Sequence, residues 1–127
     1  MMEEHCPFCS ITKDRILLEN DSGFLISDGF PVSPGHSLII PREHYADLFE
    51  IPEIARTDLF RLVDDGKKLL DSKLSPNGYN IGINSGLAAG QTVPHLHIHL
   101  IPRFSGDQED PRGGVRWIFP EKAKYWT

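Results

Sequence analysis

Three histidines alternate with aliphatic residues in one short stretch, His95-Leu96-His97-Ile98-His99-Leu100-Ile101. In an extended backbone successive side chains point to opposite faces, so the imidazoles would share one face and the aliphatic side chains the other. A helix would scatter the same imidazoles around its circumference. Because an imidazole is largely neutral near pH 7, it can serve as a nucleophile, a proton carrier or a metal ligand. The stretch therefore predicts a strand that carries a reactive site.

Two other interpretations of this stretch have to be weighed. A solvent-facing strand can carry histidines without any chemistry, and a His-x-His pair on a strand can hold a catalytic zinc ion with a water in the open position. Three histidines in strict alternation beside the glycine-rich loop Ser85 to Gly90 favour a functional site. The choice between the chemistries depends on the surrounding sequence.

The surrounding sequence resembles the signature of the histidine triad (HIT) family. The resemblance rests on Ala89-Gly90-Gln91-Thr92-Val93-Pro94-His95-Leu96-His97-Ile98-His99 and on the earlier segment Pro31-Val32-Ser33-Pro34-Gly35-His36, so it extends over most of the chain. It implies an α+β, HIT-like fold, with an antiparallel sheet of about five strands and one long helix, in a single domain over residues 1–127. It also implies a nucleotide-binding hydrolase or transferase that cleaves an α-phosphate bond through a nucleotidyl-histidine intermediate.

The resemblance also assigns roles to the histidines. It places the nucleophile on His97, the middle residue of the triad, and makes His95, His99 and His36 the supporting imidazoles. A neutral imidazole suits this reaction because one ring nitrogen carries a lone pair while a hydrogen bond to the other fixes the tautomer. On this interpretation no separate base is required.

Two polar residues before the triad are the expected phosphate contacts. A phosphoryl group in transit spreads negative charge over its oxygens, and donors must already point at that position. By resemblance, the side chains of Gln91 and Thr92 would donate to the bridging oxygen and the leaving group, and Gly86 and Gly90 would let backbone amides approach. Without the triad beside them, Gln91 and Thr92 would be interpreted as the polar start of a strand, and the two glycines as part of a tight connection.

The nucleotide pocket is assigned by resemblance as well. Asp28 falls where a carboxylate accepts hydrogen bonds from the ribose hydroxyls, and Asn84 and Gln91 fall near the phosphates. Ile26 and Leu38 fall where apolar side chains enclose the base. These two residues could equally belong to the ordinary core, because apolar strand residues usually do.

The sequence has two cysteines, Cys6 and Cys9, which are too close together for a disulfide between them to link distant parts of the domain. A redox pair normally follows a strand and opens a helix, and this stretch lacks that context, so zinc is the better interpretation. Resemblance to the family completes a closed four-ligand site with His44 and His95, in which zinc has a structural role and does not activate water. His5 is a spare candidate ligand, and unpaired reduced thiols are the alternative.

The elements that must position these residues follow from apolar periodicity. Alternation and turn residues predict strands over residues 23–28, 36–40, 79–84 and 93–101, the second closed by Pro41. The first two strands could pair as neighbours. Apolar residues at helical spacing predict one long helix over residues 52–74, with Pro52 in its first turn; they are Ala55, Leu59, Leu62, Val63, Leu69 and Leu70.

The bulk composition excludes several classes of protein. Hydrophobic residues make up 39% and charged residues 24% of the 127 residues, which is typical of a globular domain. The net charge of −5 argues against binding of a nucleic acid polymer, which requires clustered lysine and arginine. We find neither a membrane-spanning stretch nor a signal peptide, so a cytoplasmic location is expected.

The expected substrate is a nucleotide, and three functions share the same residues. Resemblance at Ala89 to Val93 and Arg103 to Asp107 favours dinucleoside polyphosphates of the diadenosine type, as in the fragile histidine triad proteins. A nucleoside phosphoramidate hydrolase is the second interpretation. The third is a nucleotide-sensing interaction module whose turnover is incidental, because a motif alone does not establish catalysis.

A homodimer is expected, because a small sheet leaves edges that symmetric association commonly covers, and the family resemblance agrees. The helix over residues 52–74 and the strand over residues 79–84 would form the interface. Trp117 and Trp126 could then reach the neighbouring pocket. The basic and aromatic residues after the triad would suit an extended phosphate chain or its leaving group.

Overall fold

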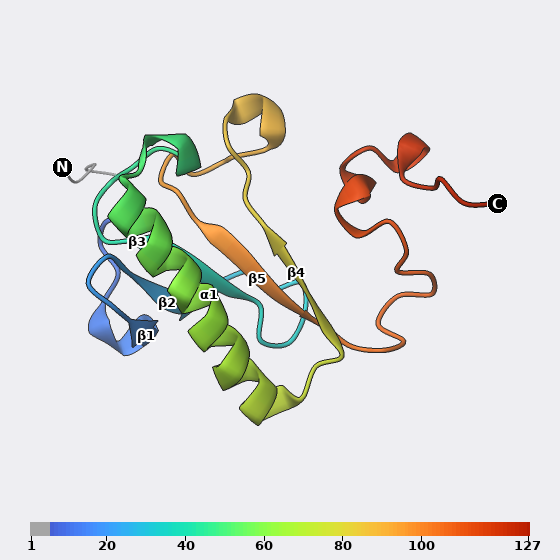
Figure 1. The fold of residues 1–127 in the computed structure, drawn as a ribbon, viewed down its shortest axis with the longest axis horizontal. Helices are drawn as coiled ribbons and strands as arrows, with labels where there is room; N and C mark the ends of the chain where they lie inside the picture. Colours follow the sequence, from blue (N-terminus) through green and yellow to red (C-terminus); the bar gives the residue numbers. More distant parts are fainter. Residues whose placement is uncertain (1–5) are drawn as a thin grey trace.

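A computed structural model describes residues 6–127 of the chain, which form an antiparallel sheet covered on one face by a helix (Figure 1). Among the described residues the sheet has five strands in the order β1-β2-β3-β5-β4, namely β1 (Ile16–Glu19), β2 (Gly23–Ser27), β3 (Ser37–Pro41), β4 (Gly78–Gly82) and β5 (Ile98–Arg103). Helix α1 (Glu53–Leu74) connects β3 to β4. The predicted α+β fold is confirmed.

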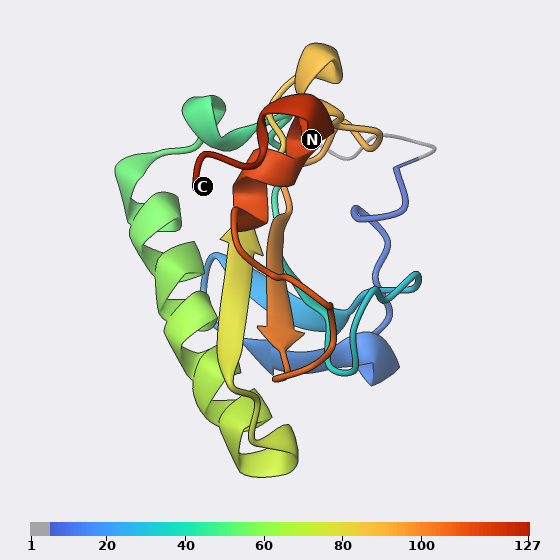
Figure 2. The same ribbon diagram turned by 90° about the vertical axis from the view of Figure 1, so that its right-hand side faces the viewer.

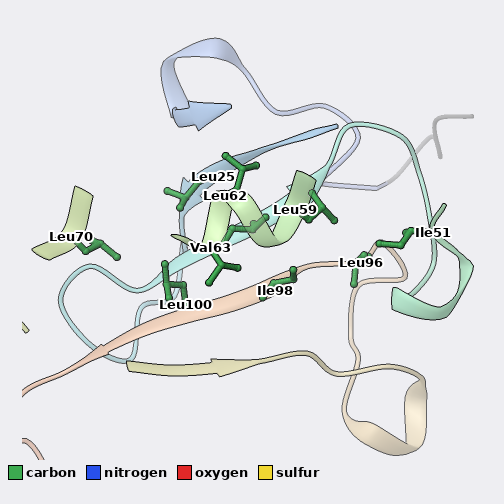
Figure 3. Packing of buried hydrophobic residues seen from close by; sticks show 10 residues of the cluster. Leu25, Ile51, Leu59, Leu62, Val63, Leu70, Leu96, Ile98 and Leu100 are labelled. Atoms are coloured by element: carbon green, nitrogen blue, oxygen red, sulfur yellow. The ribbon is translucent and has the colours of Figure 1, made fainter. Parts of the chain in front are cut away.

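The main core lies between α1 and the sheet (Figure 3). Of the apolar helix residues predicted from the sequence, Leu59, Leu62, Val63 and Leu70 are buried here, whereas Ala55 and Leu69 are only partly buried. Strands β2 and β3 and the histidine stretch contribute Leu25, Ile39, Leu96, Ile98 and Leu100. Burying each aliphatic side chain stabilises the fold by roughly 1.5–3 kcal/mol. Leu96, Ile98 and Leu100 therefore anchor one face of the segment that carries the histidines.

Gly66 sets how closely the helix approaches the sheet. A Cβ atom at this position would lie 2.5 Å from Cδ1 of Leu25 and 2.9 Å from Cδ2 of Leu100. Both distances are shorter than van der Waals contact, so with a larger residue here either the two buried leucine side chains would have to change conformation or α1 would have to move away from β2 and β5.

The opposite face of the sheet has a second apolar cluster, built from Phe24, Ile26, Leu38 and Ile40. Side chains alternate along β2, so Ile26 lies on this face while Leu25 faces α1. The amino-terminal segment covers the cluster with Phe8, Ile11 and Ile16. This face, away from the helix, is the one that carries the candidate site.

Several element boundaries differ from the sequence prediction. The last strand begins at Ile98 instead of residue 93, because the backbone N–H of Leu96 donates to the carbonyl of Tyr45 at 2.7 Å and not to the sheet ladder. Strand β3 ends at Pro41 as expected, and Pro41 itself is still part of the strand, opposite Gly23. Pro52 is the N-cap residue of α1 and precedes its first helical residue, Glu53, although we expected it within the first turn.

The carboxyl-terminal tail, residues 104–127, lies over β4 and β5 on the sheet side away from α1 (Figures 1 and 2). It contains two short 3-10 helices, Gly114–Ile118 and Pro120–Lys122. Arg116 ties the tail together by donating to the carbonyl oxygens of Ala123 at 3.1 Å and Lys122 at 2.7 Å. Within residues 6–127, no helix has the length and hydropathy needed to cross a membrane.

Candidate functional site

His97 is held in one tautomer by its own segment. Its Nδ1 lies 2.9 Å from the carbonyl oxygen of His95. A carbonyl only accepts hydrogen bonds, so Nδ1 carries the proton and Nε2 of the neutral ring carries a lone pair. The residue is 9% exposed, which leaves a small accessible edge. This is the arrangement that a nucleophilic imidazole requires.

Beside His97, the side chains of His36, His99 and Asp28 form a hydrogen-bond chain. The backbone N–H of Val32 donates to Nδ1 of His36 at 3.1 Å, so the proton of the neutral ring is on Nε2. This Nε2 lies 3.0 Å from Nδ1 of His99 and 3.2 Å from Oδ2 of Asp28. Nδ1 of His99 therefore accepts, and Nε2 of His99 carries a proton. The His97 and His99 ring centroids are 5.2 Å apart, so a lone pair and a donor lie on neighbouring rings.

Burial keeps the two imidazole rings of this hydrogen-bond chain, those of His36 and His99, neutral. Burial lowers the pKa of His36, although the carboxylate of Asp28 opposes the change. Burial also lowers the pKa of His99, and the neighbouring His97 and His36 rings act in the same direction. Both rings are therefore neutral near pH 7, and the tautomers described above hold at that pH.

Cys6, Cys9, His44 and His95 come together in a second cluster, drawn from the amino-terminal turn, the loop before α1 and the histidine stretch. All four ligand atoms lie within 4.8 Å of one another. Nδ1 of His95 is 3.3 Å from Sγ of Cys6 and 3.1 Å from Nδ1 of His44, which in turn is 3.1 Å from Sγ of Cys9. Ligands bound at about 2.0–2.3 Å in a tetrahedron are separated by such distances. This cluster could hold a metal ion.

Asp28, His36 and His99 also lie close enough together for a metal ion. Nδ1 of His36, however, accepts from a backbone N–H, so its Nε2 carries a proton and offers no lone pair to a metal. In His95 the arrangement is reversed, because Nε2 donates to the carbonyl of Pro41 at 3.0 Å and Nδ1 faces the thiols. The cluster with the cysteines therefore suits a metal, and the cluster with Asp28 suits hydrogen bonds.

Phe8 connects the cysteine turn to the candidate nucleophile. Its ring centroid lies 5.1 Å from that of His97 and 6.0 Å from that of His95, in edge-to-face geometry. The sequence prediction did not include Phe8 among the site residues. Its position between Cys6 and Cys9 is the signal that could have pointed to it.

Of the two predicted phosphate contacts, Gln91 is buried and Thr92 is exposed. Both ends of the Gln91 amide are engaged, because Oε1 accepts from the N–H of Gly86 at 2.8 Å and Nε2 donates to the carbonyls of Ala46 and Val93 at 2.6 and 3.0 Å. These bonds fix the loop that leads into the histidines. Thr92 is exposed. For both residues, contact with a phosphate stays a prediction.

Besides Gln91, four residues were predicted for the nucleotide, and they lie on the same sheet face or at its edge. Asn84 follows β4 and lines a cavity that also reaches His36 and His99. Asp28 follows β2, and its side chain is 13% exposed. Ile26 and Leu38 are a buried cross-strand pair. Their contacts with ribose, phosphate and base stay predictions.

His5, the spare metal ligand of the sequence analysis, lies outside the described residues.

Comparison with known proteins agrees with this geometry. Residues 11–106 match the HIT domain. The chain belongs to the histidine triad family. Within this family, solved structures share its fold. A histidine triad nucleotide-binding protein from Sulfolobus tokodaii superposes with a TM-score of 0.75 at 31% identity, covering 96% of this chain and 77% of that one.

Other relatives of this histidine triad protein are named for a reaction or a metal. The adenosine 5′-monophosphoramidase hnt1 of Schizosaccharomyces pombe is 35% identical over 127 residues, covering 94% of this chain and 90% of that protein. The asymmetrical bis(5′-nucleosyl)-tetraphosphatase of the same organism is 42% identical over 77 residues, covering 61% of this chain and 42% of that protein. A zinc-bound histidine triad protein from Mycobacterium smegmatis has a TM-score of 0.69 at 33% identity, covering 75% and 69% of the two chains.

Proposed function

We propose that this histidine triad protein is a nucleotide hydrolase that cleaves the α-phosphate bond of its substrate through a covalent intermediate on His97. The observation that carries the proposal is the hydrogen bond from Nδ1 of His97 to the carbonyl of His95, because it leaves Nε2 with a lone pair. The names of two relatives, a phosphoramidase and a tetraphosphatase, support hydrolysis of a nucleotide.

The reaction proceeds in two displacements at phosphorus. In the first, Nε2 of His97 forms a bond to the α-phosphorus, and the leaving group departs with the electrons of its bond and takes up a proton from solvent. In the second, water attacks the same phosphorus, the P–N bond to His97 breaks, a nucleoside monophosphate is released and a proton returns to solvent. Each displacement is easier than direct attack by water on the original bond.

Donors beside His97 stabilise the charge that develops on the phosphate oxygens. Nε2 of His99 carries a proton because its Nδ1 accepts from His36, so His99 donates a hydrogen bond without itself being charged. Thr92 and Asn84 are the proposed side-chain donors for the phosphate oxygens. Gln91 acts by shaping the loop, since its amide is engaged with backbone groups. Asp28 accepts from the ribose hydroxyls.

We propose zinc as the metal at Cys6, Cys9, His44 and His95. The donor set of two thiols and two imidazoles is typical of structural zinc sites, and Nδ1 of His95 is available because Nε2 donates to Pro41. When bound, a zinc ion would link the amino-terminal turn to the histidine stretch. Phe8 then lies fixed against the ring of His97.

Two classes of substrate fit the proposed chemistry. The sequence resemblance favours a dinucleoside polyphosphate, and similarity to the tetraphosphatase supports it. Similarity to the monophosphoramidase over nearly the whole chain supports a nucleoside phosphoramidate. Both classes deliver the same nucleotidyl group to His97 and differ in the group that leaves.

We propose a homodimer as the working form. Strand β4 is an edge of the sheet, and its Ile81 is exposed. An open edge with an apolar residue is a surface that a second copy can cover by symmetric pairing. A cytoplasmic location and the lack of binding to nucleic acid polymers stay predictions from composition.

Stereochemistry at phosphorus tests the proposed function. With a substrate that is chiral at the α-phosphorus, two displacements retain the configuration, whereas one direct attack by water inverts it. We expect retention, together with a mass adduct of one nucleotidyl group on the peptide that contains His97 after rapid quenching. Inversion would disprove the intermediate. Near-zero rates on both diadenosine tetraphosphate and adenosine 5′-phosphoramidate would instead indicate a nucleotide-sensing module.

A further inference from the structure

Asp28, His36 and His99 form a hydrogen-bonded row with two accessible ends and a buried centre. We call these three side chains the Asp28 relay. The side chains of Asp28 and His99 are 13% and 24% exposed, whereas that of His36 is 4% exposed. A ligand at the candidate site can therefore contact the carboxylate and the His99 ring, and His36 has almost no surface to offer it.

The one ring proton of neutral His36 has two acceptors. Because Nδ1 accepts from the backbone N–H of Val32, this proton is on Nε2. Nε2 lies 3.0 Å from Nδ1 of His99 and 3.2 Å from Oδ2 of Asp28. An N–H that is shared between two acceptors bonds less strongly to each of them. The bond from His36 to His99 therefore depends on how strongly Asp28 competes for the same proton.

Backbone contacts hold the carboxylate of Asp28 in this competing position. Its Oδ1 accepts from the backbone N–H of Phe30 at 2.8 Å, and the backbone N–H of Asp28 donates to the carbonyl of His36 at 3.0 Å. Oδ2 is thus directed toward the imidazoles and also lies 3.9 Å from Nδ1 of His99. A carboxylate at this place favours a proton on Nδ1 of His99, which would leave Nε2 of the neutral ring without one.

The charge of Asp28 acts on both rings of the relay. Burial lowers the pKa of His36 and of His99, and the carboxylate opposes this change at each ring. A group that donates a hydrogen bond to Oδ2 takes up part of the negative charge and of the acceptor capacity of the carboxylate. It therefore strengthens the arrangement in which His36 donates to Nδ1 of His99 and the proton of His99 stays on Nε2.

We propose that the ribose hydroxyls of the substrate set the state of His99 through Asp28 and His36, so that the protein selects ribonucleotides in the chemical step as well as in binding. The inference rests on the proposed function, in which Asp28 accepts from these hydroxyls. A hydroxyl that donates to Oδ2 releases the N–H of His36 to His99, and Nε2 of His99 then keeps its proton for the phosphate. Asp28 is thus a positioning residue in addition to a ligand of the sugar.

Two substrates with the same base and the same leaving group test the proposal. They are adenosine 5′-phosphoramidate and its 2′,3′-dideoxy analogue. In the wild type we expect the analogue to have a higher KM and also a kcat that is lower by about three- to ten-fold, the effect of weakening one hydrogen bond. Equal kcat values would overturn the proposal, because Asp28 would then bind the sugar without influencing His99.

Two variants separate the relay from a purely structural role of Asp28. Asp28→Ala removes the competing acceptor, so kcat should be equal for the two substrates and, for the dideoxy analogue, higher than in the wild type. His36→Ala retains the sugar contact and breaks the relay, so the difference in KM should persist while the difference in kcat disappears. A structural role would lower kcat for both substrates and leave their ratio at its wild-type value, which would refute the relay.

The tautomer of His99 gives a measurement that needs no turnover. The nitrogen chemical shifts of a histidine ring distinguish Nδ1 from Nε2 protonation, and His99→Gln assigns the signals in protein labelled with ¹⁵N-histidine. We expect saturating AMP to move the His99 signals further toward the state protonated on Nε2 than saturating 2′,3′-dideoxy AMP does. The two nucleotides carry the same phosphate, so this difference reports the sugar. Identical shifts would overturn the proposal.

The outcomes distinguish this proposal from the proposed function. If both phosphoramidates are hydrolysed with the same kcat, the relay is wrong and the chemistry at His97 stands. If neither phosphoramidate nor diadenosine tetraphosphate is hydrolysed, the proposed function is wrong, and the nitrogen shifts with AMP still decide whether the sugar acts on His99.

Discussion

Nε2 of His36 lies 3.0 Å from Nδ1 of His99, and this contact joins the residue that precedes β3 to strand β5 at the point where the candidate site begins. The backbone N–H of Val32 fixes the proton of His36 on the side that faces His99. His36 therefore acts as a positioning residue. It determines which nitrogen of His99 carries the proton.

We predict that His36→Ala lowers kcat by about 10- to 100-fold with little change in KM, because His99 loses the partner that fixes its tautomer. His36→Gln retains an N–H near the same place and should recover part of the rate. Steady-state kinetics of the three proteins checks this. A His36→Ala enzyme with an unchanged kcat would show that the contact has no role in turnover.

His97→Ala should reduce turnover by at least about a thousand-fold, since it removes the atom that bonds to phosphorus. The buried Leu96 and Ile98 on either side keep the segment in the core, so the melting temperature and nucleotide binding should remain close to those of the wild type. Rate, melting temperature and nucleotide affinity are measured on the same sample. Turnover at the wild-type rate would refute His97 as the nucleophile.

One zinc ion per chain is expected in protein purified without added metal. Cys9→Ser should abolish the metal and lower the melting temperature by about 5 °C or more, while kcat changes less, because the metal ties elements together and takes no part in the displacement. Elemental analysis and thermal unfolding measure both effects. His5→Ala is the matched control and should retain the metal.

Two results would contradict the zinc prediction. A metal-free protein that is fully folded and active would show that the four ligands have no structural role. Activity that is lost at once on chelation and restored by several divalent ions would indicate a catalytic metal instead.

The free energy of unfolding should fall as the pH drops below about 6.5. Burial lowers the pKa values of His36 and His99 in the folded protein, so below 6.5 the unfolded chain binds protons that the native state does not. Their contribution is fully present above the unfolded pKa and is lost as the pH falls toward the folded values, at most about 1.4 kcal/mol per group and pH unit. Denaturant unfolding measured between about pH 5 and about pH 7.5 gives this slope. A His36→Gln, His99→Gln double variant should give a flatter one, and an identical slope would refute the assignment.

Light scattering should give the mass of a dimer. A chain truncated before Trp117 loses part of the wall of the cavity that reaches His36 and His99, together with the exposed apolar residues that follow Trp117. We expect its preference among leaving groups to change while the nucleotidyl adduct on His97 still forms. A monomer whose truncated form keeps the same preference would contradict both the dimer and the role of the tail.

The fold was predictable where periodicity is strong. Strict alternation around Leu96 and Ile98 and the helical spacing of Leu59 and Leu62 match the buried positions of the structure. Strand β1 was missed because its four residues, Ile16–Glu19, form an apolar run too short to distinguish a strand from a helix.

The site was predictable in its residue types and less so in its contacts. The resemblance grouped Cys6 and Cys9 with two histidines, and the structure brings those four side chains together. No sequence pattern shows that a carbonyl will accept from His97 or that Arg103 will be neutralised by Asp107, because backbone groups and tail contacts depend on tertiary placement. The basic residues after the triad had suggested a site for an extended phosphate chain. Arg103 pairs with Asp107 and Arg112 pairs with Asp110, and these carboxylate partners weaken that interpretation for the two arginines.

Strand β5 is the last strand of the described chain, yet it lies between β3 and β4 in the sheet. A ribosome makes the chain from its amino end, so β3 has no neighbour on one side until β5 has emerged, and Cys6 and Cys9 are synthesised long before His95. Insertion of one late segment therefore completes the sheet, the metal cluster and the row of histidines in the same event. A nascent chain interrupted after β4 lacks the complete sheet, the metal cluster and the row of histidines, so the candidate site is assembled only after the histidine stretch has been synthesised.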